Sequence, residues 1–299
     1  MCVSHCEQSD LSNLKNPFAP LDAALAEAMV VNIRAALLED IGSGDWTAML
    51  LPDSSQVKAK VVVREDAVLC GAPWFEGVMK QVDSQLGIEW HVAEGDWMPA
   101  GSTVCSISGS ARSLMTAERP ALNFLQLLSG VATATRDYVQ IIEGTKASIL
   151  DTRKTLPGLR LAQKYAVRVG GGKNQRLALY DGILIKENHI AAAGGIKAAM
   201  DAAHSLNAGV SIQIEVESLN ELQQALDAGA TSILLDNFTN DMMREAVAIT
   251  AGRAVLEASG GVNRDSVRAI AETGVDRISI GALTKDLKAT DYSLRVNSR

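Results

Sequence analysis

The chain has 299 residues, of which 47% are hydrophobic and 21% are charged, a balance typical of globular proteins. This length allows a large hydrophobic core and predicts two domains. The longest apolar runs are far too short to cross a bilayer and the first residues lack a charged and then apolar leader, so we expect a cytoplasmic protein without a membrane partner. The formal net charge of −7, without a long basic track, argues against a nucleic-acid partner.

The cysteines are predicted to be free thiols, because no Cys-x-x-Cys pair accompanies them and the expected compartment is reducing. They are Cys2, Cys6, Cys70 and Cys105. Cys2, His5 and Cys6 have side chains that could together ligate a metal ion. Their position within residues 1–20, a polar stretch with two prolines, favours a flexible N-terminal tail instead.

Residues 21–130 mix helical and strand patterns and predict an N-terminal open α/β sandwich. Helices are expected at 21–38, where Ala and Leu recur at helical spacing, and at 74–86. Strands are expected at 57–64, 67–70, 88–93 and 103–108, and turns at 39–47 and 95–101. The C-terminal tail, residues 286–299, is expected to join this domain.

From Ser113 onward the pattern is helical, and one proline divides it. Leu122 and Leu125 recur at helical spacing on its apolar face. Pro120 has no amide hydrogen, and its ring clashes with the preceding turn. We therefore expect the helix to break or kink at Pro120 and to restart there, with Arg119 beside the break.

Residues 131–285 repeat a strand–helix unit, in places about every 22 residues, and this repeat predicts parallel strands with right-handed crossovers. Strands are expected at 148–150, 183–185, 211–216, 232–235, 254–257 and 277–280. Ser218 and Glu221 predict a capping box at the start of one helix, and Gly229 ends that helix. The repeat fits a barrel or a doubly wound sheet, and six units are two short of a closed eight-stranded barrel.

Residues 151–190 form a cationic stretch in an otherwise acidic chain. They contain eight Lys and Arg against three Asp and Glu, a local charge of +5. Such an island favours a small, highly charged anionic ligand. Four cations stand where strands should end and are expected to face that ligand: Arg153, Lys154, Arg176 and Lys186. Three others are spaced by four residues on a predicted helix and are expected to be solvated: Arg160, Lys164 and Arg168.

Polar residues also follow the other predicted strands. Because the carboxyl ends of parallel strands converge on one face, we expect these residues to build the active site. Glu215 and Asp236 suit a ligand that is rich in hydroxyls or chelated to Mg²⁺, since Mg²⁺ takes one or two carboxylates plus substrate oxygens. The glycine turns that follow the last two strands suit a phosphate group. These turns are Ser259-Gly260-Gly261 and Gly281-Ala282.

Two features remain open on the sequence alone. His189 follows a predicted buried strand, where a packed histidine is as common as a catalytic one. Gly170–Gly172 fit either a phosphate-binding nest or the end of a helix. The sequence shows no Ser-His-Asp, Cys-His, zinc or dinucleotide-binding pattern.

Several ordered motifs carry a resemblance to a known family. They are EDIGSGDWT, TAER-x-ALN-x-LQ-x-LSG, DTRKT-x-PGLR, GGG-x-N-x-R, D-x-x-LIK-x-NH, E-V-E, LDN, SGG and GALT. Together, from about Leu37 to Lys285, they resemble quinolinate phosphoribosyltransferase, the decarboxylating enzyme of NAD biosynthesis. The resemblance implies an incomplete α/β barrel after the sandwich and a homodimer whose subunits share active sites. It also implies the substrates quinolinate and phosphoribosyl pyrophosphate with Mg²⁺ as cofactor.

The resemblance also implies roles for individual residues. Quinolinate is expected to contact Arg119, Arg153, Arg176 and Lys186, with Lys154 shared with the phosphoribosyl donor. Glu215 and Asp236 are expected near the donor's ribose hydroxyls and Mg²⁺, so Lys154, Lys186, Glu215 and Asp236 are the expected catalytic residues. The turns Ser259–Gly261 and Gly281-Ala282 are expected to bind the 5′-phosphate. Gln175 stands where the family pattern has His, and Gln can only hydrogen-bond there.

Three other functions fit parts of the pattern. A phosphoribosyltransferase could act on another ring acid. A sugar-phosphate aldolase or isomerase could use Lys186 as a Schiff-base lysine at a strand end, although the crowd of cations argues against it. A phosphate-binding barrel without activity is the third.

Overall fold

The computed structural model describes residues 13–296, which divide into two compact units. One unit comprises the chain up to Thr133 together with the segment from Leu287 onward, and the other is Ala134–Asp286. The predicted metal ligands Cys2, His5 and Cys6, and most of the predicted flexible tail, lie outside the described residues. Within them, Cys70 and Cys105 are buried free thiols, as predicted.

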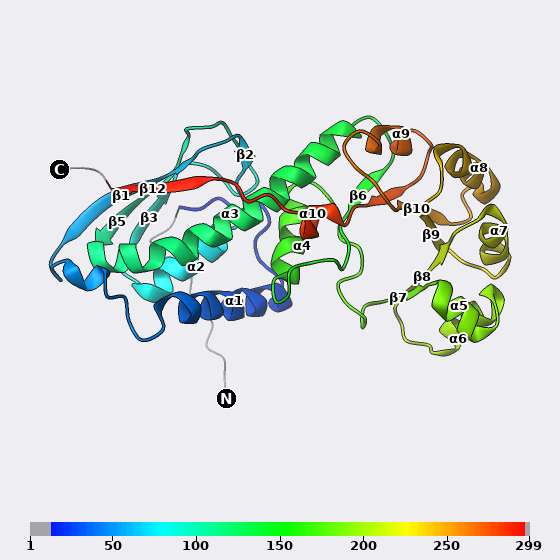
Figure 1. Ribbon diagram of the computed structural model, residues 1–299, viewed down its shortest axis with the longest axis horizontal. Helices are drawn as coiled ribbons and strands as arrows, with labels where there is room; N and C mark the ends of the chain where they lie inside the picture. Colours follow the sequence, from blue (N-terminus) through cyan, green and yellow to red (C-terminus); the bar gives the residue numbers. More distant parts are fainter. Residues whose placement is uncertain (1–12, 297–299) are drawn as a thin grey trace. The chain divides into compact units, whose positions relative to one another are not determined.

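The first unit is built on an antiparallel four-stranded sheet in the order β12-β1-β5-β3 (Figure 1). Its strands are β1 (Gln56–Val63), β3 (Gly87–Trp90), β5 (Thr103–Ser110) and β12 (Tyr292–Val296). The end of the chain thus returns to this sheet, where Val61 is the register partner of Leu294 on β12. A second, two-stranded sheet joins β2 (Ala67–Val68) and β4 (Trp97–Met98). Strand β4 lies inside residues 95–101, which were predicted as a turn. The strand was missed because two residues are too few to show an alternating apolar pattern.

The helices of the first unit include α1 (Ala23–Ile41), the 3₁₀ turn η1 (Ala48–Leu50) and α2 (Ala72–Val82). Helix α1 begins where the Asp22 side chain accepts a hydrogen bond from the Leu25 N–H at 2.9 Å. Helix α2 begins two residues earlier and ends four residues earlier than predicted. No helix in the part of the chain that the structure describes has the length and apolarity needed to cross a bilayer.

Helix α3 (Ala111–Ile141) runs through Pro120, so the predicted break is wrong. The proline removes one backbone hydrogen bond and costs about 3 kcal/mol in a helix interior. The helix also buries an apolar face on both sides of it, where Leu114, Leu122 and Leu125 are at most 1% exposed. Each fully buried leucine stabilises by about 1.5–3 kcal/mol. Burial of this face therefore outweighs the local penalty.

The second unit contains a six-stranded parallel sheet in the order β6-β11-β10-β9-β8-β7. Its strands are β6 (Ser148–Leu150), β7 (Gly182–Ile185), β8 (Ser211–Val216), β9 (Ser232–Asp236), β10 (Val255–Ser259) and β11 (Arg277–Ser279). All six were predicted within two residues at each end. The edge strands β6 and β7 are not paired with each other within residues 13–296, so the sheet is an incomplete barrel. The predicted fold class is confirmed.

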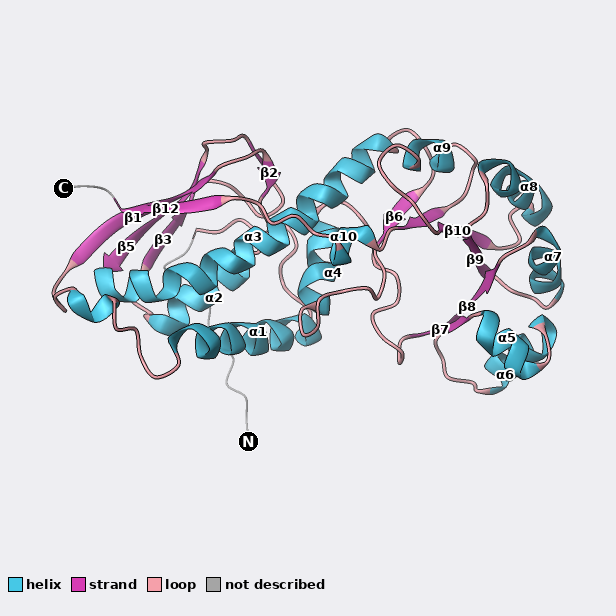
Figure 2. Cartoon of the chain, in the orientation of Figure 1, coloured by secondary structure: helices cyan, strands magenta, loops and turns pink. Residues whose placement is uncertain are grey.

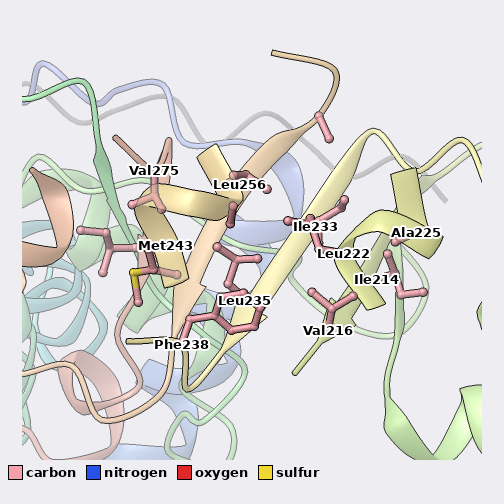
Figure 3. Packing of buried hydrophobic residues seen from close by; sticks show 14 of the residues in the cluster. Ile214, Val216, Leu222, Ala225, Ile233, Leu235, Phe238, Met243, Leu256 and Val275 are labelled. Carbon is pink, nitrogen blue, oxygen red and sulfur yellow. The ribbon is translucent and has the colours of Figure 1, made fainter. Parts of the chain in front are cut away.

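Helices cover one side of this sheet, as Figure 2 shows for α7, α8 and α9. The helices of the unit are α4 (Arg160–Val169), α5 (Glu187–Ala193), α6 (Ile196–Ser205), α7 (Leu219–Asp227), α8 (Asn240–Thr250), α9 (Val267–Ala271) and α10 (Ala282–Lys285). Alternate strand residues such as Ile214 and Ile233 pack against helix residues such as Leu222 in one apolar cluster (Figure 3). Because strand side chains alternate in direction, polar residues between them face the other side of the sheet.

The predicted cap of helix α7 is present in part. The Ser218 hydroxyl accepts a hydrogen bond from the Glu221 N–H at 3.2 Å, as predicted. The Glu221 carboxylate, however, accepts from the Glu217 N–H at 2.7 Å rather than from Ser218. The side chain thus satisfies the backbone one residue before the cap, and the helix starts at the predicted place.

Candidate functional site

The carboxyl ends of the parallel strands place a lysine against a buried carboxylate. Lys186 follows β7, and its Nζ donates to Glu215 Oε2, near the end of β8, at 2.8 Å. The Glu215 side chain is 8% exposed and that of Lys186 43%. Burial raises the pKa of the Glu215 carboxyl, and the hydrogen bond from Lys186 offsets part of that rise. The two predicted catalytic residues therefore form one ion pair that lies partly open to solvent.

The next two strands bring Asp236 and Ser259 together as register partners at their last residues. Asn237 joins their ends, because its Nδ2 donates to Asp236 Oδ2 at 2.8 Å and its backbone N–H donates to the Ser259 carbonyl at 3.0 Å. Gly260 then turns the chain with φ +97°, and a Cβ there would lie 2.1 Å from Asn237 Oδ1. No side chain fits at this position. The turn therefore presents bare backbone, as a phosphate cradle requires.

The glycine turn after β11 lies against the predicted donor lysine. A Cβ on Gly281 would lie 3.2 Å from Lys154 Cδ. The Thr284 hydroxyl, in α10, donates to the Lys154 carbonyl at 2.7 Å. The Lys154 side chain itself is exposed. The structure thus brings together the ends of β6 and β11, and with them Lys154, Gly281 and Ala282.

Two arginines are close enough to repel each other. Burial and the nearby charge of Arg153 both lower the pKa of the Arg176 guanidinium. The Arg153 Nε is buried and has no hydrogen-bond partner within residues 13–296. Arg176 donates through Nη1 to the Gly182 carbonyl at 2.9 Å. Paired cations with an unsatisfied donor are suited to an anionic ligand.

Lys164 is not solvated, so that prediction is wrong. Its side chain is 1% exposed and donates to the Asp151 carboxylate, which is fully buried. Asp151 also accepts from Asn174 Nδ2 at 2.5 Å and from the Gln175 N–H at 3.0 Å. Of the other two cations in that group, Arg168 is exposed and Arg160 is half-buried. The buried pair thus anchors the segment that carries Gln175 and Arg176.

His189 and the glycine triplet both lie at helix ends. His189 Nδ1 accepts a hydrogen bond from the Lys186 N–H at 3.0 Å, at the start of helix α5. The N–H groups of Gly170, Gly171 and Gly172 all donate to carbonyls in the last turns of α4. No amide of the triplet is left for a phosphate. The helix-end alternative is therefore the correct one for Gly170–Gly172.

Sequence reasoning missed a polar layer inside the barrel. Gln213 and Glu257 lie on β8 and β10 and are 6% and 1% exposed. Gln213 Nε2 donates to Glu257 Oε2 at 3.0 Å, and Gln175 Nε2 donates to Gln213 Oε1 at 2.7 Å. Polar residues alternate with isoleucines in Ser211–Val216, a pattern typical of a strand with a polar face. That alternation is the signal that could have revealed Gln213.

Comparison with models of known protein families shows which family the chain belongs to. A family model described as the C-terminal domain of quinolinate phosphoribosyl transferase matches residues 131–295, and the model of its N-terminal domain matches residues 45–129. The chain belongs to the quinolinate phosphoribosyltransferase family. This confirms the resemblance carried by the sequence motifs, and with it the prediction of an enzyme.

Individual relatives of this family agree along most of their length. A Bacillus subtilis protein, named as a probable carboxylating nicotinate-nucleotide pyrophosphorylase, is 40% identical over 87% of this chain and 90% of its own. A solved structure of the nicotinate-nucleotide pyrophosphorylase of Francisella tularensis is 46% identical with a TM-score of 0.88, and covers 91% of this chain and 96% of its own. A Streptococcus pyogenes structure is 36% identical with a TM-score of 0.89, over 93% and 99%.

The family resemblance implied Mg²⁺, and the donors present fit that ion. The negative charge of Asp236 raises the pKa of Glu215, so the two carboxylates interact. Among the described residues no group of three His, Cys, Asp or Glu side chains could hold a metal ion alone. Two carboxylates suit Mg²⁺ when the substrate supplies further oxygens.

Arg119 shares none of these contacts. It lies on helix α3 in the first unit, whereas all the other predicted site residues lie in the second. Its side chain is 58% exposed, and the nearest carboxylate oxygen, Glu118 Oε1, is 3.7 Å away. Its guanidinium is thus largely free to meet a ligand or another subunit.

Proposed function

We propose that the carboxyl ends of the parallel strands carry the activity of this family, the decarboxylating phosphoribosyl transfer to quinolinate in NAD biosynthesis. The observation that carries the proposal is the pair Arg153 and Arg176, whose like charges interact. Like charges are brought together at partial burial, and the Arg153 Nε has no partner in the described chain. Such an arrangement is costly without an anion, and quinolinate is a dianion.

Quinolinate carries two carboxylates on neighbouring ring carbons. Arg153 and Arg176 supply guanidinium forks, which match carboxylates in two hydrogen bonds at once. Lys186 adds a cation that is already oriented by Glu215. Lys154 lies beside the glycine turn at Gly281 and is proposed to contact both substrates. These cations hold the ring with its nitrogen turned toward the donor sugar.

Phosphoribosyl pyrophosphate is proposed to occupy the other strand ends. Its 5′-phosphate binds the backbone of the two glycine turns, Ser259–Gly261 and Gly281-Ala282, and its ribose hydroxyls bind Glu215 and Asp236. These two carboxylates would also hold Mg²⁺, largely through the donor's oxygens. When bound, the ion stabilises the negative charge that develops on the departing pyrophosphate.

The reaction needs alignment and charge stabilisation rather than a nucleophilic side chain. The pyridine nitrogen attacks C1 of the ribose while the bond from C1 to pyrophosphate breaks, and the ring nitrogen becomes positively charged. The C2 carboxylate then leaves as CO₂, and its bonding electrons stay on C2, next to the cationic nitrogen. Protonation of C2 gives nicotinate mononucleotide. The negative charge of Glu215 and Asp236 favours the positive charge that develops on the ribose.

The proposal includes a homodimer with shared active sites, in which Arg119 reaches the partner's barrel. Support comes from large apolar side chains that are exposed in the first unit. Val30, Val31 and Leu38 on helix α1 are 59–71% exposed, and Leu50 is 82% exposed. Exposed apolar side chains of this size are typical of a subunit interface. The free thiols Cys70 and Cys105 support the proposed cytoplasmic location, where cysteines stay reduced.

The aldolase alternative is disfavoured by the hydrogen bond that Lys186 makes to Glu215. A Schiff-base lysine must lose its proton before it attacks a carbonyl. The Lys186 amine is hydrogen-bonded to the Glu215 carboxylate at 2.8 Å, so a carbonyl carbon would have to displace this contact to reach the nitrogen. The phosphoribosyltransferase reaction needs Lys186 only to contact the substrate.

The test is a substrate-omission assay on the purified protein. Quinolinate labelled at the 2-carboxyl group is mixed with phosphoribosyl pyrophosphate and Mg²⁺, and released pyrophosphate and CO₂ are measured. We expect equal amounts of both products, and none when either substrate is left out. Nicotinate replaces quinolinate in a parallel reaction. Pyrophosphate release with nicotinate but not with quinolinate would indicate that the enzyme acts on another ring acid. No release with either acid would contradict the proposal.

A further inference from the structure

The backbone of Lys186 is held on both sides by one histidine. The Lys186 N–H donates to His189 Nδ1 at 3.0 Å, and the Lys186 carbonyl accepts from the His189 N–H at 2.8 Å. His189 is the third residue of helix α5, and Lys186 is the residue that precedes this helix. A side chain at the third helical position that accepts from that preceding N–H is one half of a capping box. His189 therefore caps α5 at the residue whose amine contacts Glu215.

Lys186 lies beyond the part of β7 that the sheet holds in register. Within residues 13–296, β7 is at one edge of the parallel sheet, and its register with β8 ends at the pair Ile185 and Ile214. Lys186 follows this pair in extended backbone, with φ −123° and ψ 171°. Its Nζ nevertheless meets Glu215 Oε2 at 2.8 Å. The place of the amine therefore depends on what fixes the Lys186 backbone, and His189 supplies the acceptor for its N–H.

Helix α5 itself adds little packing to the second unit. It has seven residues, of which Ile190 is half-buried against the apolar cluster and the other six are exposed. A helix this short is marginal on its own and depends on its caps and its few packing contacts. Loss of the His189 contact should therefore loosen the first turn of α5 without unfolding the unit. The consequence falls on Lys186, which stands directly before that turn.

The contact with Lys186 also fixes the state of the His189 ring. A backbone N–H can only donate, so the ring nitrogen that faces it carries no proton. The proton of the neutral ring then lies on Nε2. An asparagine can replace this acceptor, because its Oδ1 is attached to Cγ, as Nδ1 is in histidine. Alanine cannot replace it, and neither substitute carries an N–H in the place of Nε2.

We propose that His189 is a positioning residue that holds Lys186 where its amine meets a carboxylate of quinolinate. The proposal rests on the proposed function, in which Lys186 contacts quinolinate. When the cap is lost, only a fraction of the molecules hold the Lys186 amine in place, and the apparent affinity falls with that fraction. His189 acts through Lys186 in this account and touches neither substrate. It is therefore neither a packed core histidine nor a catalytic one.

The test compares His189→Ala with His189→Asn. We expect His189→Ala to raise KM and Kd for quinolinate about 5-fold, which corresponds to the loss of one helix cap. KM for phosphoribosyl pyrophosphate should stay unchanged, because Lys186 is proposed to contact quinolinate alone. His189→Asn should keep near wild-type values, since its Oδ1 replaces the acceptor. Asp22→Ala is the matched control, because it removes the cap of α1 in the first unit, and it should change neither constant.

A double-mutant cycle shows whether His189 acts through Lys186. If it does, His189→Ala should have no further effect on quinolinate affinity in a Lys186→Ala background. Additive losses would overturn the proposal, as would wild-type affinity in folded His189→Ala. An equal loss in His189→Asn would show that the ring contacts the substrate directly, and failure of His189→Ala to fold would show that the cap serves the fold. Should the wild-type protein neither bind nor consume quinolinate, the proposed function would fall instead, so the two failures are distinguishable.

Discussion

Lys164 and Asp151 form a buried ion pair whose disruption should be costly. Lys164→Met keeps the length of the side chain and removes its charge. Among residues 13–296 this leaves the fully buried Asp151 carboxylate with only Asn174 and the Gln175 N–H as partners. Removing one partner of a buried pair costs about 3–5 kcal/mol. In a unit of this size each kcal/mol lowers the melting temperature by about 2–4 °C, so we expect a fall of about 6–20 °C.

The pH dependence of this loss follows from the Asp151 carboxyl. Burial raises its pKa and Lys164 lowers it, so the substitution raises the pKa further. A carboxyl whose pKa is raised in the folded state favours folding at low pH, and this contribution is lost as the pH rises through that pKa. The deficit of Lys164→Met relative to wild type should therefore be larger at pH 8 than at pH 5.

Calorimetric melting at the two pH values measures this prediction. Arg168→Met is the matched control, because Arg168 lies one turn away on the same helix and is exposed; it should cost less than about 1 kcal/mol. Adding Asp151→Asn to Lys164→Met should recover part of the stability, since no buried charge remains. A deficit below about 1 kcal/mol, or one that does not change with pH, would refute the reasoning.

Three further predictions concern the proposed site. Gln175→His should keep specific activity across pH, because both side chains can donate to Gln213, whereas Gln175→Ala should lose activity; an inactive His variant beside a normal Ala variant would show that this segment is misassigned. Gly260→Ala should raise KM for phosphoribosyl pyrophosphate far more than Gly261→Ala, because a Cβ at Gly260 would lie 2.1 Å from Asn237 and one at Gly261 would meet nothing within 4 Å. Equal effects of the two substitutions would contradict the proposal that this turn binds the 5′-phosphate. Arg119→Ala and Lys186→Ala dimers should each be inactive. Refolding the two variants together should recover about one quarter of wild-type activity, because half the dimers are mixed and each mixed dimer has one intact site. If mass spectrometry confirms heterodimers and no activity is recovered, Arg119 acts in its own chain's site or in none.

The sequence predicted the parallel strands well because buried apolar runs followed by polar turns are local signals. It was wrong where tertiary packing outweighs local preference. Pro120 predicts a helix break, but the buried leucines on both sides of it keep α3 continuous. The helical spacing of Lys164 predicts a surface cation. Its partner Asp151 lies thirteen residues earlier at a strand end, and helical spacing does not reveal that contact.

In the proposed site, too, some residues could be predicted from local patterns and others could not. Residues at or directly after strand ends, such as Asp236 and Lys186, could be predicted because strand order fixes their place. The Gln175–Gln213–Glu257 chain could not, since it joins a loop to two strands that are 38 and 82 residues away. Orientation of an amide depends on what lies across the barrel, and that is a property of the folded chain alone.

The most direct test of the account is calorimetric titration of quinolinate into wild type, Arg153→Ala and Lys186→Ala. The central claim is that cations at the strand ends bind the two carboxylates of quinolinate. Loss of one charge-assisted contact should weaken binding by about 1.5–3 kcal/mol, which is about 10- to 150-fold, while Arg168→Ala should leave it unchanged. Wild-type affinity for quinolinate in both folded site variants would contradict the claim.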